Sequence, residues 1–495
     1  MTLHGFKQRL FSSTPRQLFW RVGLSFLSGL LVAAAFPPVN AWPLGVVGWI
    51  FLLKALWGGK VKCTSRAVFW LGFLHGVVSF GLSLHWLVRL FSSAAPVLIA
   101  IAALFPALFC LLEYESRGLT RNPLLKALLV AMLWTGVEFY RSELFFLRLS
   151  WITPGLALGP TSITPILGVY GGTFFVIFAC ALFSWQESRV WGAVSLGILL
   201  VLGALQPRPR NAPQEAFRVA SVQREGCSLD ALIEASKEFV GEGADLVLWP
   251  EYAVHMDLRQ GYPDQVGEKL GEIMTLSEEL GAPILLGTIT FVQSEEFDFY
   301  NTALLVDASG PKAEYHKMRP VHFFHDGTPG RKAKPIPVGE VSVGTPICFD
   351  GDFSLILRKM AAEGAELFAI PSCDLGSWGK IQHEQHALQL PMRAAETGRW
   401  IVSSASSGPS RIIDPEGFVI QEVPSMERGA LIGDVELIQR KTPYVLVGWL
   451  FPWICFVGTI LLLPFSYGLR RFSVHPARDE ESGPSDKFSP TGRDG

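Results

Sequence analysis

The sequence GTPICFDGDF, residues 344–353, ends a run of small and β-branched residues on a cysteine and follows it with two aspartates. A free cysteine is usually a buried and inert packing residue, so Cys348 has two interpretations. It is either a core thiol or a reactive nucleophile at the tip of a strand. The rest of the chain has to decide between them.

A layered α/β domain is predicted around this stretch, from residue 207 to residue 441. Short apolar strands alternate there with amphipathic helices, an order typical of layered α/β folds. Strands are expected in FRVASVQ, ADLVLWPE, APILLGTIT and ELFAIPSCD, a hairpin in NTALLVDASG and KAEYHK, and helices over 228–241, 264–280, 352–363 and 380–398. The sequence contains no phosphate-cradling glycine loop, so no nucleotide is expected.

The remainder of the chain has the composition of a membrane protein. Of its 495 residues, 49% are hydrophobic and only 17% are charged, and 15 are Trp and 35 are Phe. Several apolar stretches approach the ~17–25 residues that cross a bilayer. They lie at 20–36, 42–57, 67–91, 94–112, 123–140, 162–184, 190–205 and 444–466. The sequence therefore predicts an α-helical transmembrane bundle of about eight spans.

Basic residues between these stretches predict the orientation of the chain. They are Lys7, Arg9, Arg16, Arg21, Lys60, Lys62, Arg66, Arg117, Arg121, Lys126, Arg189, Arg470 and Arg471. With eight spans they all fall on one side, which the positive-inside rule assigns to the cytoplasm. The expected organisation is seven transmembrane helices in 1–206, an extracytoplasmic domain in 207–441, an eighth helix in 442–468 and a disordered cytoplasmic tail in 469–495.

Charged residues are rare inside the apolar stretches. Glu138, Arg141, Glu143 and Arg148 lie near the outer end of the fifth stretch. Snorkelling to the interface explains them, so a structural role is expected. The net charge of −2 and the lack of a basic arm give no reason to expect nucleic acid as a partner.

Three chemically active side chains stand at predicted strand ends. Glu251 ends LVLWPE, Lys317 ends EYHK, and Cys348 ends GTPICFD. Convergence at one sheet edge would suit acyl transfer. The glutamate takes the thiol proton, the thiolate attacks a carbonyl, and the ammonium stabilises the oxyanion.

These motifs resemble a known family. WPE, YHK and ICFD, in this order and at these separations, resemble the Glu-Lys-Cys triad of the nitrilase superfamily. AFPPVNAWPLGVVGWIFLL, GFLHGVVSFGLSLHW, PILGVYGGTFFVIF, YNTALLVDASG and TPYVLVGW resemble the apolipoprotein N-acyltransferase family, over nearly the whole chain. The resemblance implies an αββα nitrilase-like domain between the seventh and eighth helices of a protein of the bacterial inner membrane. It implies Glu251 as general base, Lys317 as oxyanion donor and Cys348 as nucleophile, with no cofactor.

The reaction implied by the resemblance is transfer of an acyl chain from a membrane phospholipid, through a cysteine thioester, to the N-terminal amine of a diacylglyceryl-cysteine apolipoprotein. A phospholipid and an apolipoprotein are therefore the expected partners, and the protein is expected to act as a monomer. Two alternatives stay open. One is a membrane-anchored amidase with water as acceptor, and the other is a non-catalytic copy that binds lipid or lipoprotein.

The loop after Lys317 departs from the family pattern. It reads MRPVHFFHDGTPG, with His325 in place of the second glutamate and Asp326 beside it. Two interpretations of this loop stay open: a solvated loop, or a lid whose Phe323 and Phe324 dip into lipid while Arg331 meets phosphate. Together with Asp350, which follows the cysteine, His325, Phe323, Phe324 and Arg331 are the candidates for substrate binding.

Other residues offer competing sites. Cys373 also ends a predicted strand, and Cys227 lies outside the apolar stretches. HEQH at 383–386 lacks the HExxH pattern, so solvated histidines are expected there and no metal site. The serines of SSASSGPS lack the G-x-S-x-G elbow of serine hydrolases.

Overall fold

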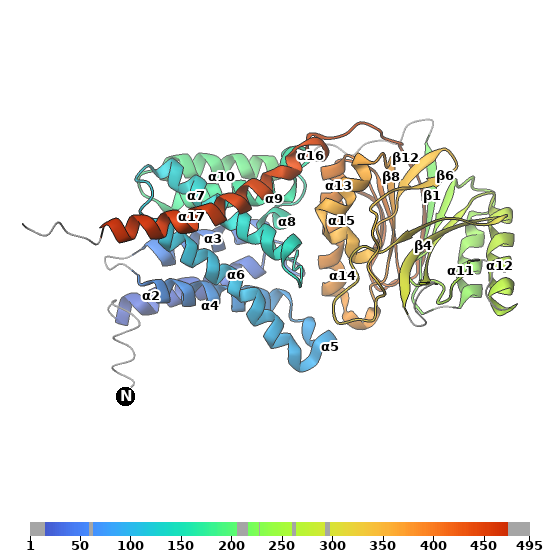
Figure 1. The fold of residues 1–495 in the computed structure, drawn as a ribbon, viewed down its shortest axis with the longest axis horizontal. Coiled ribbons are helices and arrows are strands. Elements are labelled where there is room, and N and C mark those ends of the chain that lie inside the picture. Colours follow the sequence, from blue (N-terminus) through green and yellow to red (C-terminus); the bar gives the residue numbers. More distant parts are fainter. Residues whose placement is uncertain are drawn as a thin grey trace, which may run out of the picture.

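The computed structural model describes residues 15–58, 63–204, 216–226, 228–259, 264–292 and 298–473. Figure 1 shows a helical half and an α/β half stacked end to end. Helix α2 (Pro15–Ala33) begins and helix α17 (Phe451–Ser473) ends at the extremity that points away from the α/β half.

The helical half is built from apolar helices. Besides α2 and α17 they are α3 (Trp42–Trp57), α4 (Ser65–Ser83), α5 (Leu87–Phe91), α6 (Ala95–Ser116), α7 (Pro123–Phe139), α8 (Pro154–Leu158), α9 (Thr164–Ser184) and α10 (Arg189–Ala204). Among the described residues, four helical segments are long and apolar enough to cross a membrane: Ser65–Ser83, Leu87–Ser116, Pro123–Leu144 and Thr164–Ser184. Shorter apolar helices cover Trp42–Trp57, Arg189–Gly203 and Gly448–Leu462. The helical half therefore has the lengths and composition of a membrane-embedded bundle.

Two six-stranded sheets form the centre of the α/β half. The first contains, in spatial order, β12 (Gly429–Val435), β1 (Phe217–Gln223), β2 (Leu246–Leu248), β3 (Ile284–Phe291), β4 (Phe299–Asp307) and β5 (Gly310–His316). The second contains β11 (Val419–Val423), β10 (Ser410–Ile413), β9 (Ile401–Ala405), β8 (Leu367–Ser372), β7 (Val341–Gly344) and β6 (Ile336–Val338). Each sheet has three parallel central strands, β1–β2–β3 and β7–β8–β9.

Helices cover the outer faces of both sheets. Helices α11 (Leu229–Ser236) and α12 (Asp264–Leu280) lie on the first sheet, and α13 (Ser354–Ala362), α14 (Lys380–Ala387) and α15 (Gln389–Thr397) lie between the second sheet and the helical half (Figure 1). The sheets face each other across an apolar core and are joined by hydroxyl groups, since Ser221 donates to the Ser403 carbonyl at 2.9 Å. This is the predicted αββα sandwich.

Two details of the predicted elements have clear outcomes. The hairpin is confirmed, because β4 and β5 pair in antiparallel register through Thr302 and His316. The single helix expected over 380–398 is wrong, since α14 and α15 are separate helices that meet at Leu388. Pro391 explains the break, because it has no N–H to donate to the carbonyl four residues earlier.

The charged residues near the end of α7 do not snorkel. Glu138 and Arg141 have no exposed surface, so the predicted interfacial location is wrong for both. Glu138 instead accepts hydrogen bonds from Trp134 and Thr173 at 2.9 and 2.7 Å. Glu143 reaches the other half of the molecule, where it accepts hydrogen bonds from the Ser354 backbone and hydroxyl at 3.1 and 2.9 Å. Buried polar contacts of this kind fix one half against the other.

Candidate active site

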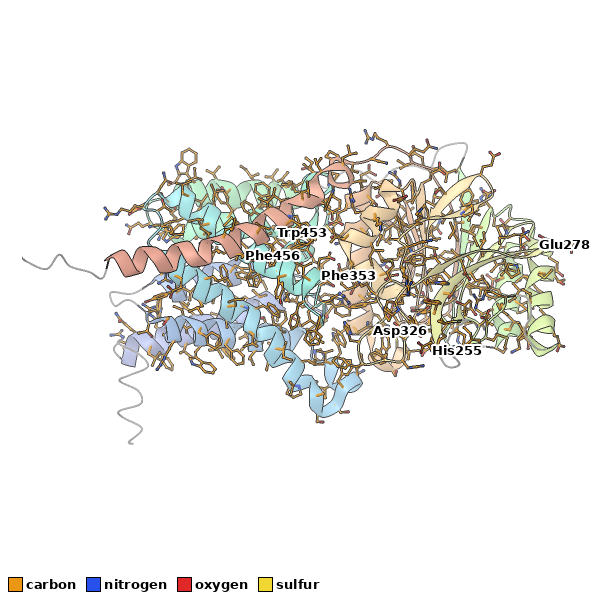
Figure 2. The ribbon with its side chains drawn as sticks, viewed as in Figure 1. His255, Glu278, Asp326, Phe353, Trp453 and Phe456 are labelled. Carbon is orange, nitrogen blue, oxygen red and sulfur yellow. The ribbon has the colours of Figure 1, made fainter. Side chains whose placement is uncertain are left out.

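The structure brings the three strand-end residues to one cavity. Glu251 follows β2, Lys317 follows β5, and Cys348 follows β7, and their exposed fractions are 3%, 1% and 5%. All three side chains line a cavity of about 420 Å³, here called the polar cavity. His255 and Asp326 line it as well, and Figure 2 labels both in the α/β half.

Cys348 occupies a sharp bend of the chain. It opens a short 3₁₀ helix, Cys348–Asp352, and its φ is +48°, in the left-handed region that non-glycine residues avoid. Such a conformation costs about 1–3 kcal/mol and is found where the surrounding structure holds a residue for function. The thiol is 3.9 Å from the Cys373 carbonyl oxygen, across the ends of β7 and β8.

Asp350 holds this bend in place. Its carboxylate accepts hydrogen bonds from the Tyr315 hydroxyl at 2.7 Å and from the backbone N–H groups of Arg319 at 2.8 Å and Ile347 at 3.3 Å. It is fully buried. These contacts tie the cysteine bend to the loop after Lys317, so Asp350 has the geometry of a residue that positions Cys348.

Lys317 lies between two carboxylates. Its ammonium group is 2.8 Å from Glu251 Oε1 and 2.8 Å from Asp326 Oδ2. The Asn301 amide donates to both carboxylates, at 2.6 Å to Glu251 and 2.8 Å to Asp326. The Tyr252 hydroxyl completes the group with a 2.7 Å hydrogen bond to Asp326.

The second carboxylate of the site therefore comes from Asp326 and not from the position of His325. The exposed His325 lines the polar cavity and packs its ring at 5.1 Å from that of Phe299. Sequence reasoning noted Asp326 but did not include it among the site residues. The sequence did contain a signal for Asp326. It is a carboxylate one position after His325, and a histidine cannot supply the carboxylate that the family has in this loop.

The pKa values of the two carboxylates are shifted in opposite directions. Burial raises the pKa of Glu251, although the Lys317 charge opposes it, so Glu251 is a stronger base than an exposed glutamate. Burial also acts to raise the pKa of Asp326, but the charge of Lys317 and the hydrogen bonds to the carboxylate outweigh it and lower the pKa. Asp326 thus stays ionised as the counterion of Lys317. Burial raises the pKa of Cys348 well above its usual value, so the resting thiol is protonated and needs a base.

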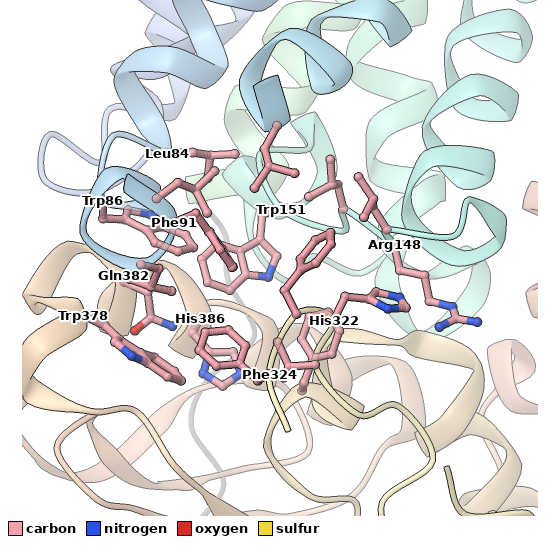
Figure 3. A pocket seen from close by; sticks show the side chains of 18 of the residues that line it. Leu84, Trp86, Phe91, Arg148, Trp151, His322, Phe324, Trp378, Gln382 and His386 are labelled. Atoms are coloured by element: carbon pink, nitrogen blue, oxygen red, sulfur yellow. The ribbon is translucent and has the colours of Figure 1, made fainter. Parts of the chain in front are cut away.

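A second cavity reaches Cys348 from the membrane side. It has a volume of about 150 Å³ and lies between the helical and α/β halves, here called the apolar cavity. Its walls come mainly from aromatic and aliphatic side chains, among them Leu84, Trp86, Phe91 and Trp151 (Figure 3). A cavity with such an apolar lining suits an acyl chain.

Four residues line both cavities: Val321, Phe324, Cys348 and Trp378. The ring of Phe324 lies 5.9 Å from Trp378 and 5.7 Å from Phe91 of α5. Phe323 also packs on Phe91, at 5.8 Å, and is 68% exposed. The predicted lid loop thus contacts the helical half next to the thiol.

One wall of the apolar cavity is polar. His386 bonds Asp374 at 2.8 Å and lies 3.3 Å from Asp352, which also accepts a hydrogen bond from the Trp151 indole. The prediction of solvated histidines at 383–386 is wrong, because His386 is 8% exposed and His383 is fully buried. Burial opposes protonation of His386, but the two aspartates outweigh it and raise its pKa well above the usual value. Among the described residues, no group of three or more His, Cys, Asp or Glu side chains could hold a metal ion.

The remaining candidates have different locations. Cys373 lines the polar cavity, and burial raises its pKa far above the usual value. Arg331 is exposed and lines neither the polar nor the apolar cavity. Cys227 falls outside the described residues.

Both halves of the chain are similar to known proteins. Residues 218–441 match the carbon-nitrogen hydrolase family, and residues 28–182 match the apolipoprotein N-acyltransferase N-terminal domain. A protein named apolipoprotein N-acyltransferase from Geobacter metallireducens is 25% identical, over 94% of this chain and 98% of that one. One of the same name from Methylococcus capsulatus is 25% identical, over 93% and 99%. Among solved structures, an amidase from Nesterenkonia sp. is 21% identical and covers 48% of this chain and 95% of its own, with a TM-score of 0.39.

Proposed function

Because this chain belongs to the apolipoprotein N-acyltransferase family, we propose that it transfers an acyl chain from a membrane phospholipid to the N-terminal amine of a diacylglyceryl-cysteine apolipoprotein. The acyl group passes through a thioester on Cys348. The family indicates an acyltransferase, and we propose the donor, the acceptor and the thioester.

One observation carries it: Cys348 lines the apolar cavity and the polar cavity at once. The apolar cavity opens toward helices long enough to cross a membrane, so a lipid acyl chain can enter it without crossing water. The polar cavity contains the base and the ammonium group that chemistry at a carbonyl needs.

In the first half-reaction, Glu251 takes the thiol proton and the thiolate attacks the ester carbonyl of the phospholipid. The Lys317 ammonium stabilises the oxyanion that forms. The bond from carbon to the glycerol oxygen then breaks, and the proton on Glu251 passes to that oxygen. A lysophospholipid leaves, and the acyl group stays on Cys348 as a thioester.

In the second half-reaction, the neutral amine of the apolipoprotein attacks the thioester carbonyl. Glu251 takes one amine proton, the carbon–sulfur bond breaks, and the proton returns to the Cys348 thiolate. Water is a competing acceptor, and a closed site suppresses it. Phe324 and Trp378, packed between the two cavities, are the side chains placed to exclude water.

The proposed setting is the bacterial inner membrane, with the α/β domain of residues 207–441 outside the cytoplasm. Seven spans in 1–206 and an eighth in 442–468 support this arrangement through the positive-inside rule, because all basic loops then share one side. A reporter fused at Gln214 and another at the C-terminus test it. A cytoplasmic signal from the reporter at Gln214 would contradict the orientation. The segment 469–495 is proposed as a cytoplasmic tail, and its residues 474–495 lie outside the described residues.

The test of function uses the purified full chain. Incubation with phospholipid alone should give an acyl adduct on Cys348 in intact-protein and peptide mass spectra. A diacylglyceryl peptide with a free amine should discharge the adduct as an amide, and the same peptide with an acetylated amine should not. Release of fatty acid at one rate with either peptide would favour the amidase. Failure to form adduct or product with any donor would favour a non-catalytic copy.

A further inference from the structure

A guanidinium and an imidazole side chain lie together at the rim of the apolar cavity. Arg148, in the loop after α7, and His322, in the loop after Lys317, both line this cavity. Figure 3 shows them beside each other, across the cavity from Trp378 and Gln382. The fold brings them together from segments more than 170 residues apart in the sequence.

Part of their hydrogen-bonding capacity is unused within the protein, although the His322 ring also makes a hydrogen bond to the Phe146 backbone. Arg148 Nε, Arg319 Nε and His322 Nε2 are buried nitrogen atoms without a hydrogen-bond partner. Among the described residues, no carboxylate forms an ion pair with Arg148 or Arg319. Buried donors are rarely left unpaired, so each such group calls for an explanation, and a missing ligand is one.

The two arginine charges repel each other, and the charge of Arg148 disfavours protonation of His322. Burial lowers the pKa of Arg148, and the charge of Arg319 lowers it further. Burial and the charge of Arg148 likewise lower the pKa of His322. The neighbouring carboxylate of Glu143 attracts Arg148, but it is engaged by the backbone and hydroxyl of Ser354. An added anion would relieve this repulsion, accept from the free Arg148 Nε, and favour the protonated form of His322, whose Nε2 can then donate to the anion.

The surroundings of this rim are those of a membrane interface. Phe146, two residues before Arg148, is 61% exposed, and Phe323, next to His322, is 68% exposed. Exposed aromatic rings beside cationic side chains are typical of surfaces that contact the acyl and phosphate layers of a bilayer. The anion is therefore expected at the depth of lipid phosphates, at the entrance to a cavity that suits an acyl chain.

We propose that Arg148 and His322, supported by Arg319 behind them, form a phosphate site that binds the headgroup phosphate of the phospholipid donor. This inference rests on the proposed acyl transfer and names the part of the donor that the rim recognises. Phosphate at the rim fixes one end of the donor while its acyl chain enters the apolar cavity, and the ester between them is held near Cys348. The site recognises phosphate itself, so it does not select among headgroup alcohols.

The test compares a donor that carries phosphate with one that does not. Arg148→Gln, His322→Gln and the double variant are assayed for thioester formation from phosphatidylglycerol vesicles and from a p-nitrophenyl ester of the same fatty acid. Arg428→Gln, which neutralises an exposed arginine, is the matched control. Each single substitution should raise the apparent KM for the phospholipid by about ten-fold, the scale of one charge-assisted hydrogen bond, and leave the p-nitrophenyl ester unaffected. Unchanged KM for phospholipid in the double variant, or an equal rise for both donors, would overturn the proposal.

A binding measurement separates this proposal from the proposed reaction. Native mass spectrometry of the Cys348→Ala protein should find retained phosphatidylglycerol, and adding Arg148→Gln and His322→Gln should remove most of it. Equal retention with and without the two rim substitutions would overturn the site, even if the thioester forms as proposed. Thermal stabilisation by inorganic phosphate but not by phosphatidylglycerol vesicles would assign the rim to free phosphate and also overturn the proposal.

Discussion

The polar cavity draws its reactive side chains from the ends of strands in one α/β domain, whereas the apolar cavity draws its walls from loops and helices of both halves. Glu251, Lys317 and Cys348 each follow a strand, so the sheets alone place them. Trp86, Trp151 and the other apolar walls reach the thiol only because the two halves dock. In the proposed reaction, the reacting side chains thus come from one half of the molecule, whereas the cavity proposed for the acyl donor is formed where the two halves meet.

The largest effect is expected where the two cavities meet. Cys348→Ala should abolish both the acyl-enzyme and the product, because no other group supplies the nucleophile. Cys348→Ser should do nearly the same, since a hydroxyl has a far higher pKa than a thiol. Intact-protein mass spectrometry and an acylated-peptide assay measure both. Cys373→Ala is the matched control and should retain activity. Product from Cys348→Ala but not from Cys373→Ala would make Cys348 a core thiol.

Removing a polar-cavity partner should cost less than removing the thiol. Glu251→Gln removes the base and Lys317→Met the oxyanion donor, and each should lower the rate of thioester formation by about 10²–10⁴-fold. The double variant should lose little more than the worse single variant, because the groups act as a unit. Asp326→Asn should slow the reaction more than His325→Ala, since only Asp326 contacts Lys317. The opposite ranking would return the role to His325.

The polar wall of the apolar cavity should govern stability and its pH dependence. His386→Gln leaves two buried aspartates without their cation and should lower the free energy of unfolding by about 3 kcal/mol near neutral pH. The folded-state pKa of His386 is raised, so its contribution is full below the unfolded pKa and is lost as pH rises through the folded pKa. The stability difference between wild type and variant should therefore narrow toward alkaline pH. Thermal unfolding in detergent from pH 6 to pH 10 measures it, and a constant difference would contradict the charged histidine.

Removing a side chain that separates the two cavities should change which acceptor, water or amine, receives the acyl group, more than it changes the use of the donor. Phe324→Ala removes a ring that lines both cavities and packs on Phe91 and Trp378, so water should reach the thioester. We expect about a ten-fold rise in fatty acid released per amide formed, by analogy with the protection that a closed site gives to reactive intermediates. Fatty acid and amide are measured in the same incubation. Phe291→Ala, an exposed ring on β3, is the control. An unchanged ratio would mean that Phe324 does not exclude water.

The smallest effect is expected from the basic loop outside both cavities. Neutralising Arg331, Lys332 and Lys334 together removes charges that are exposed and away from the thiol. Any contribution to donor binding then acts through the membrane surface, at about 1 kcal/mol per charge or less. The apparent KM is measured with anionic and with zwitterionic vesicles. A rise for the anionic vesicles alone would indicate a contribution to donor binding, and no change for either would indicate a solvated loop. A larger loss than that of the Arg148 and His322 double variant would place the phosphate contact on this loop.

The three strand-end residues and the αββα layers could be predicted because both follow from local pattern. Strand ends are marked by the change from apolar to polar residues, as in LVLWPE and GTPICFD, and short strands alternating with amphipathic helices restrict the architecture. The helical pattern over 380–398 did not predict the break in that helix, because a single residue, Pro391, divides it into α14 and α15.

The sequence by itself determined that the protein has a membrane-type half and an α/β half, and that Glu251, Lys317 and Cys348 each follow a strand; only the tertiary structure brought them to one cavity, from strands of two facing sheets and not from one sheet edge. Only the tertiary structure decided that Asp326 is the second carboxylate, because reach and direction of a loop side chain are not local properties. It alone placed Glu138, Arg141 and His386 in the interior, since burial of a charge depends on partners that lie far away in the chain. The same holds for Arg148 and His322, which become neighbours only when the two halves meet around the apolar cavity.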